Sequence, residues 1–290
     1  MGIGEVLARA EQLTVLDRAV APLQRAVRAI VPPSRVRDAL HGTWLGHPTH
    51  PALVQLPTAL WTSAVVLDRL PGNERAARLL VGLGVLGSLP AALSGATDWS
   101  ELHEQQMRVG LLHAVANAGA VVLLGMSWVQ RGGSHRSAPR GQLAAVAGMG
   151  FAAAGAMIGG HLAYRQAAGV NHTEAVPHLV SPGWRPAGRA DSVVEGEPTR
   201  RMVDDVPVLV LRVQGTVYVL ADECSHLSGP LSDGQLQQRS GAWCIVCPWH
   251  DSTFALDGGA VVTGPATAPQ PSFEVREEGG ELLLRLAGAG

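Results

Sequence analysis

Apolar residues follow two different periodicities along this chain, one helical and one strand-like. The first part contains four apolar stretches, roughly residues 51–67, 79–96, 109–130 and 141–164, and the last two contain no charged residue. A helix of about 20 residues crosses a hydrocarbon core of about 30 Å. The pattern therefore predicts an α-helical transmembrane bundle of four spans at residues 41–165. The alternative is a soluble, alanine-rich bundle.

Alternating runs follow a proline-containing linker at residues 166–182. The runs at 206–213, 216–220, 242–246 and 281–286 place apolar residues at every second position, with glycine-rich turns between them. This period of two is typical of half-buried antiparallel strands. We therefore expect an all-β domain at residues 183–290.

Residues 1–40 precede the apolar stretches. Between residues 5 and 30, apolar residues recur at three-, four- and seven-residue steps, and arginines fall between them. The pattern predicts an amphipathic N-terminal helix, which either lies at a membrane interface or packs on the body of the protein.

Composition narrows the functional classes. The 290 residues suit two domains, and the net charge is −2. A strongly basic balance is absent and no lysine occurs, which argues against a nucleic-acid partner. Three cysteines are too few for a disulfide framework.

Two short pairs in the predicted β domain carry the candidate chemistry: Cys224-Ser-His226 and Cys247-Pro-Trp-His250. Two thiolates and two imidazoles are the ligands of a [2Fe–2S] centre in which two His replace two Cys on one iron. The alternative is a Cys2His2 zinc site, although zinc modules usually pair Cys with Cys and His with His.

The sequences flanking these pairs, C-S-H-L-S-G-P-L-S-D-G and C-P-W-H-D-S-T-F-A-L, resemble the Rieske family over roughly residues 183–288. The resemblance implies a [2Fe–2S] cluster, with Ser252 donating a hydrogen bond to it. Gly229 and Trp249 stand where some members have disulfide cysteines, and Phe254 replaces a donating tyrosine. Fewer donors imply a reduction potential below that of the bc-type members.

A second resemblance covers about residues 40–165. Gly46-His47-Pro48-Thr-His50-Pro51, with Asp98-Trp99 and His113…Asn117, is similar to a family of uncharacterised bacterial four-helix membrane domains with an H-P-x-H-P motif. It implies fold and topology only. His113 and His161 each lie about one turn inside a span, and facing histidines could ligate a b-type haem, hold a metal or bind a quinone. A structural polar cluster is the alternative.

Four spans place both chain ends on one side of the membrane. Two loops are rich in arginine, at Arg69, Arg75 and Arg78 and at Arg131, Arg136 and Arg140, which favours these loops inside. Against this, the N-terminal segment is itself rich in arginine and shows no export signal, and the missing disulfide fits a reducing compartment. We expect a multi-pass protein of the bacterial inner membrane with the β domain on the cytoplasmic face.

The predicted function is a membrane-anchored carrier of single electrons between a soluble or membrane redox partner and a membrane component. One alternative is a membrane oxidoreductase subunit that uses the histidine-lined bundle site for quinone or haem. Another is a redox-sensing or assembly subunit. The oligomeric state is left open, and no separate catalytic residues are recognised.

Overall fold

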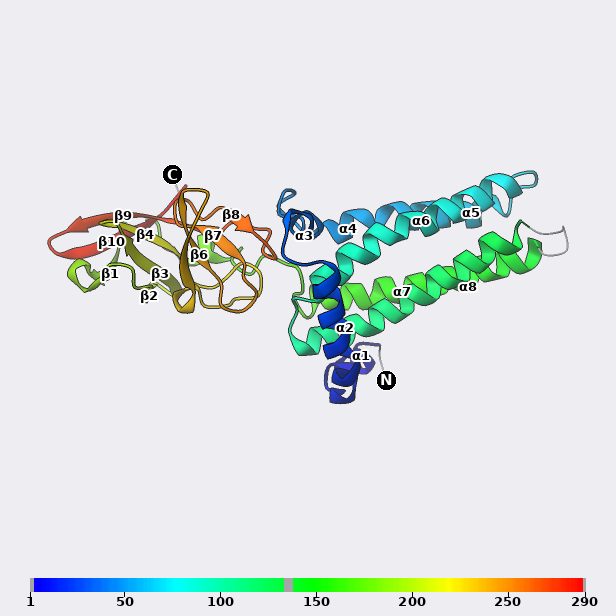
Figure 1. Ribbon diagram of the computed structural model, residues 1–290, viewed down its shortest axis with the longest axis horizontal. Coiled ribbons are helices and arrows are strands. Elements are labelled where there is room, and N and C mark those ends of the chain that lie inside the picture. Colours follow the sequence, from blue (N-terminus) through cyan, green and yellow to red (C-terminus); the bar gives the residue numbers. More distant parts are fainter. Residues whose placement is uncertain (1–2, 133–137, 289–290) are drawn as a thin grey trace. The chain divides into compact units, whose positions relative to one another are not determined.

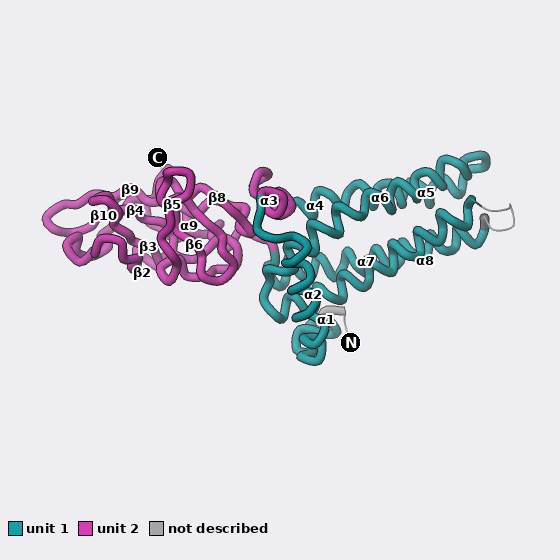
Figure 2. The backbone as a smooth tube through the Cα atoms, viewed as in Figure 1, with its two compact units in different colours: residues 1–34, 49–168 teal, residues 35–48, 169–290 magenta. Residues whose placement is uncertain are grey.

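The computed structural model describes residues 3–132 and 138–288. The chain forms two compact units, one of residues 1–34 with 49–168 and one of residues 35–48 with 169–290 (Figure 2). The first is helical and the second is built mainly from strands. Arg136, counted above among the loop arginines, lies outside the described residues.

Long helices α5–α8 form the body of the helical unit (Figure 1). Its elements are α1 (Ile3–Glu11), η1 (Thr14–Leu16), α2 (Asp17–Ile30), α4 (Thr49–Leu53), α5 (Gln55–Leu67), α6 (Glu74–Trp99), α7 (Glu104–Gln130) and α8 (Ala138–Tyr164). Helix α6 packs on α5 and α7, while α8 packs on α7 and α5, so the four helices close into a bundle.

Three of these helices, α6, α7 and α8, are long and apolar enough to cross a membrane. The first predicted span, 51–67, instead falls in α4 and α5, which are separated at Val54. Pro57 lies in the first turn of α5, where a missing N–H costs no helical hydrogen bond. The prediction of four spans is thus confirmed only for three candidate helices.

The bundle is packed with small side chains and covered with large apolar ones. Helix α6 buries Ala77, Gly84 and Ser88 among other small residues, while Leu86 and Leu89 on the same helix are exposed. A helix on the surface of a soluble protein shows a polar outer face. Small residues at helix contacts and large apolar residues outside are typical of helices that pack within lipid.

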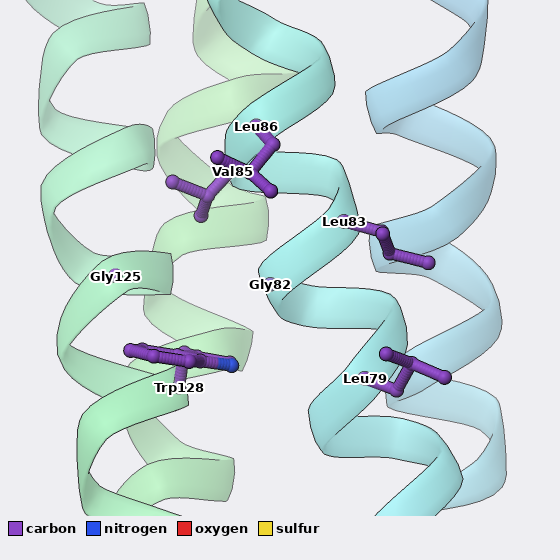
Figure 3. A pocket seen from close by; sticks show the side chains of 7 residues that line it. All are labelled: Leu79, Gly82, Leu83, Val85, Leu86, Gly125 and Trp128. Atoms are coloured by element: carbon purple, nitrogen blue, oxygen red, sulfur yellow. The ribbon is translucent and has the colours of Figure 1, made fainter.

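An apolar groove of about 300 Å³ lies between α6 and α7 (Figure 3). Its lining consists of Leu79, Gly82, Leu83, Val85, Leu86, Gly125 and Trp128. Gly82 faces the indole of Trp128, because a Cβ at Gly82 would lie 2.6 Å from the indole nitrogen. The groove is therefore lined by apolar side chains and glycine, with the indole of Trp128 as its one aromatic group.

Residues 5–30 lie in two α-helices, α1 and α2, with the short 3-10 helix η1 between them, and not in the single helix predicted. Arg108 donates to both carboxylate oxygens of Asp17 at 2.7 Å, and Arg28 pairs with the buried Glu101 at 2.9 Å. Helix α2 therefore packs on the body of the unit through charged groups. Leu23 and Ile30 stay exposed, so the helix also presents apolar side chains outward.

Over its described residues, which end at 288, the β unit contains ten strands in three antiparallel sheets, which confirms the predicted all-β domain (Figure 1). They are β1 (Arg185–Arg189), β2 (Thr199–Val203), β3 (Val206–Val213), β4 (Thr216–Ala221), β5 (Gln235–Arg239), β6 (Ala242–Val246), β7 (Thr253–Ala255), β8 (Val261–Thr263), β9 (Phe273–Glu278) and β10 (Glu281–Leu286). The sheets are ordered β1-β10-β9, β2-β3-β4 and β5-β6-β7-β8.

Two segments outside the predicted β domain belong to this unit. Helix α3 (Arg35–His41) approaches the loop after β8, where Asp38 accepts the Gly264 N–H at 3.0 Å. The predicted linker contains α9 (Val176–Leu179), and Val176 is buried in the core of the unit. The observed division thus differs from the predicted boundaries at 40/41 and 182/183, because α3 contacts the loop after β8 and the linker residues Val176 and Val180 are buried in the core of the β unit.

Candidate metal centre

Two loops of similar construction carry the predicted ligands. Cys224 follows β4, and its N–H donates to the Gly229 carbonyl at 2.9 Å; Cys247 follows β6, and its N–H donates to the Ser252 carbonyl at 2.8 Å. In each loop the fourth residue after the cysteine, Ser228 or Asp251, has a positive φ and donates back to the cysteine carbonyl. The backbone conformation thus curls each loop around its cysteine.

The two thiols lie together in the interior. Cys224 and Cys247 are buried and share a side-chain hydrogen bond. The bond with Cys224, together with the main-chain N–H groups of Trp249 and His250, lowers the pKa of Cys247 to about 7, against the opposing effect of burial. The same bond and burial raise the pKa of Cys224. Amides directed at sulfur stabilise negative charge there, as a thiolate ligand requires.

The two imidazoles form a second pair. The ring centroids of His226 and His250 are 5.1 Å apart, with perpendicular ring planes. Both side chains are half-buried, whereas both cysteines are buried, and Trp249 beside His250 is 48% exposed. The histidine pair therefore lies toward the surface and the cysteine pair toward the core.

This segregation favours a two-iron cluster over zinc. A structural zinc ion takes four ligands around one point. A [2Fe–2S] cluster takes only two protein ligands at each iron, and thiol paired with thiol and imidazole with imidazole matches that need.

Ser252 contacts the cysteine pair directly. Its side chain is fully buried, hydrogen-bonds Cys224 and accepts the Ala266 N–H at 3.0 Å. Phe254, in the position of the family's tyrosine, is also fully buried and has no hydroxyl to donate. Ser252 thus hydrogen-bonds a candidate ligand, and its hydrogen bond to a bound cluster stays a prediction.

Packing joins the two loops where a disulfide is absent. Cys224, Cys244 and Cys247 are all free thiols. A Cβ on Gly229 would lie 2.8 Å from the Cys247 sulfur and 3.0 Å from the Trp249 ring. Only glycine allows this approach, so the indole of Trp249 lies against the first loop in place of a covalent link.

Gln270 was not identified from the sequence, and its buried side chain holds the loop that carries Cys224 and His226. Gln270 is buried; its Oε1 accepts the Ser225 N–H at 3.2 Å, and its Nε2 donates to the Ala221 carbonyl at 2.7 Å. The Ser225 hydroxyl donates to the Ala268 carbonyl at 2.8 Å. The proline-rich run from Gly264 to Pro271 was the available signal, because such a run forms an irregular loop that needs side-chain partners.

The predicted pairing of His113 with His161 does not match the contacts of these residues. His161 Nε2 lies 2.9 Å from Glu11 Oε1. The ring next to His113 is that of His50, with centroids 6.1 Å apart. His161 thus contributes to the attachment of α1, and His113 belongs to a different cluster.

The β unit, with a buried thiol pair and a half-exposed imidazole pair on adjacent loops, defines a class of iron–sulfur electron-transfer domain. Comparison with known proteins agrees. A family model described as Rieske [2Fe-2S] domain matches residues 183–274, and one described as predicted membrane protein (DUF2231) matches residues 46–172. Both resemblances drawn from the sequence are confirmed.

Ferredoxin subunits are among the similar proteins. The 3-phenylpropionate/cinnamic acid dioxygenase ferredoxin subunit of Escherichia coli (strain K12) is 36% identical over 95 residues, 32% of this chain and 85% of that protein. The anthranilate 1,2-dioxygenase ferredoxin subunit of Burkholderia cepacia is 29% identical over 103 residues, 36% of this chain and 92% of that protein.

A solved structure, the ferredoxin of carbazole 1,9a-dioxygenase from Nocardioides aromaticivorans IC177, is 31% identical, with a TM-score of 0.32, and covers 35% of this chain and 97% of that one. The chain belongs to the Rieske ferredoxin family, here joined to a DUF2231 domain.

Proposed function

We propose that this protein is a membrane-anchored Rieske electron carrier that exchanges single electrons with a redox partner at the exposed histidine edge of its β unit. The observation that carries the proposal is the division of the candidate ligands. The cysteine pair is buried, and the histidine pair is half-buried beside an exposed Trp249. A site that is closed on one side and open on the other defines one route for electrons.

In this proposal Cys224 and Cys247 hold one iron, and His226 and His250 hold the other. A bound [2Fe–2S] cluster supplies one-electron redox chemistry. The protein supplies main-chain amides directed at the cysteine sulfurs, and Ser252 adds a side-chain hydrogen bond to Cys224. These donors stabilise the more negative, reduced state.

The helical unit is the proposed anchor. Helices α6, α7 and α8 have the length and composition of membrane spans, and large apolar side chains cover their outer faces. We assign residues 49–67, the run of α4 and α5, as the fourth span, with the bacterial inner membrane as the location. Leu23 and Ile30, exposed on α2, fit the headgroup region beside the spans.

A redox protein is the proposed partner of the β unit. A related solved structure is described as a complex of reduced oxygenase and oxidized ferredoxin in carbazole 1,9a-dioxygenase. A partner of the oxygenase or reductase kind would dock around Trp249 and the histidine pair. We place this unit on the cytoplasmic face, because Gly229 and Trp249 leave no disulfide that would need an oxidising compartment.

The test uses the full chain in lipid nanodiscs, reduced with dithionite, freed of excess reductant and mixed with cytochrome c as a one-electron acceptor. We expect a rhombic Rieske EPR signal before mixing and about one electron delivered per protein. The Cys247→Ser variant should lose the signal and the transfer but still co-float with liposomes.

An unchanged signal in Cys247→Ser would refute the ligand assignment, and failure to float would refute the anchor. Reduction of the cluster by quinol alone would instead identify a membrane oxidoreductase. A cluster that delivers no electron to the acceptor would indicate a sensing or assembly role.

A further inference from the structure

A second pair of histidines lies in the helical unit, apart from the cysteine–histidine loops. His50 comes from α4 and His113 from α7, and their ring centroids are 6.1 Å apart with planes at 78°. Ionisable side chains within membrane helices are costly to bury, so two that meet there are expected to have a function.

Backbone contacts fix the same tautomer in both rings. His50 Nδ1 lies 2.8 Å from the Ala91 carbonyl oxygen of α6, and His113 Nδ1 lies 2.8 Å from the Gly155 carbonyl oxygen of α8. A carbonyl only accepts, so each Nδ1 carries the proton and each Nε2 keeps its lone pair. A ring N–H donated to a backbone carbonyl is the usual orientation of a metal-ligating histidine.

Three glycines make room for these side chains. A Cβ on Gly95 would lie 2.7 Å from His50 Nδ1, and one on Gly159 would lie 3.1 Å from His113 Cε1. A Cβ on Gly155 would lie 2.6 Å from the amide of Asn117, whose Nδ2 is 3.2 Å from His113 Nε2. The G-x-x-x-G step of α8 therefore accommodates polar side chains of α7.

We infer that His50 and His113 bind a transition-metal centre through their Nε2 atoms, as a two-imidazole site between α4 and α7. Imidazole suits zinc, copper, iron and nickel. The same chemistry can come from a bare ion or from haem iron, and the inference does not depend on the iron–sulfur site.

The test is a binding titration of the full chain in nanodiscs, with Zn²⁺ and Cu²⁺ in one arm and hemin in the other. We expect one equivalent of metal ion or of hemin to bind per chain, in one of the two arms. Elemental analysis measures bound metal ion, and a Soret band reports bound hemin. His50→Gln and His113→Gln should each weaken binding more than about 100-fold, beyond the 10–100-fold typical of losing an outer hydrogen-bond partner.

The matched control is His161→Gln, which removes the contact with Glu11 and should leave affinity unchanged. Far-UV circular dichroism and the thermal midpoint in nanodiscs show whether each variant keeps its helices. The inference is overturned if neither probe binds the wild-type chain, if a folded His50→Gln and a folded His113→Gln both bind normally, or if His161→Gln weakens binding as much as they do.

Discussion

Replacing Ser252 by alanine is expected to lower the reduction potential of the loaded protein. The Ser252 side chain is fully buried, hydrogen-bonds Cys224 and accepts the Ala266 N–H. A donor to a cysteine ligand binds the reduced state more strongly, because the added electron increases the negative charge on sulfur. Its removal therefore destabilises the reduced state relative to the oxidised one.

The size of the shift follows from the strength of such a bond. Hydrogen bonds to charged groups contribute about 1.5–3 kcal/mol. We assume that about half of this energy is gained only when the cluster is reduced. For a one-electron couple, in which 59 mV corresponds to a factor of ten, its loss lowers the reduction potential by about 30–65 mV. The variant also leaves the buried Ala266 N–H without its acceptor, which should lower the free energy of unfolding by about 1–3 kcal/mol.

Protein-film voltammetry, or a redox titration followed by EPR, measures this potential directly. The matched control is Ser225→Ala, which removes another buried hydroxyl from a cluster loop. That hydroxyl bonds the Ala268 carbonyl and not a cysteine, so the potential should change by much less. A potential that stays constant or rises in Ser252→Ala would refute the proposed role, and so would equal shifts in both variants.

Three further outcomes are expected. Phe254→Tyr should raise the potential by supplying the second side-chain donor, and an unchanged or lower value in voltammetry would contradict this. Asp68→Ala should lower the free energy of unfolding by about 3–5 kcal/mol, because it removes the carboxylate that pairs with the buried Arg131. In thermal unfolding, the double variant with Arg131→Ala should recover part of that loss. The Ser181 N–H lowers the pKa of Asp204, so its contribution to stability is fully present above about pH 4 and is lost as the pH falls further. Asp204→Asn should therefore unfold at a lower temperature than wild type at pH 7, and the difference should shrink as the pH is lowered below about 4.

The Rieske domain was predictable from sequence because its candidate ligands lie in short contiguous motifs. Two Cys–His pairs a few residues long specify ligand type, and each follows a strand that could be read from alternation. Gln270 was not predictable, because its contact with Ser225 joins residues 45 positions apart. A buried amide that supports a loop has no local signature in a single sequence.

In the helical unit, the sequence predicted the helices but not the contacts of their polar side chains. The length of the apolar stretches identified α6, α7 and α8. Which polar side chains meet depends on how each helix is rotated about its axis, and a sequence that is apolar on all sides does not define that rotation. His113 and His161 were paired on depth alone. The structure directs His161 to Glu11 and His113 to His50, because α1 packs on one end of the bundle and α4 extends along it.

The cluster loops also contact two segments that lie outside the residues matched by the Rieske family model. That model matches residues 183–274, whereas the β unit also includes residues 35–48 and 169–182. The His172 N–H donates to the Ser225 carbonyl at 3.0 Å, and Asp38 accepts the Gly264 N–H in the loop that reaches Ser252 through Ala266. Both segments are also the ones through which the chain passes to the helical unit. The loops that carry the candidate ligands are therefore held in part by the two segments that connect the β unit to the helical unit.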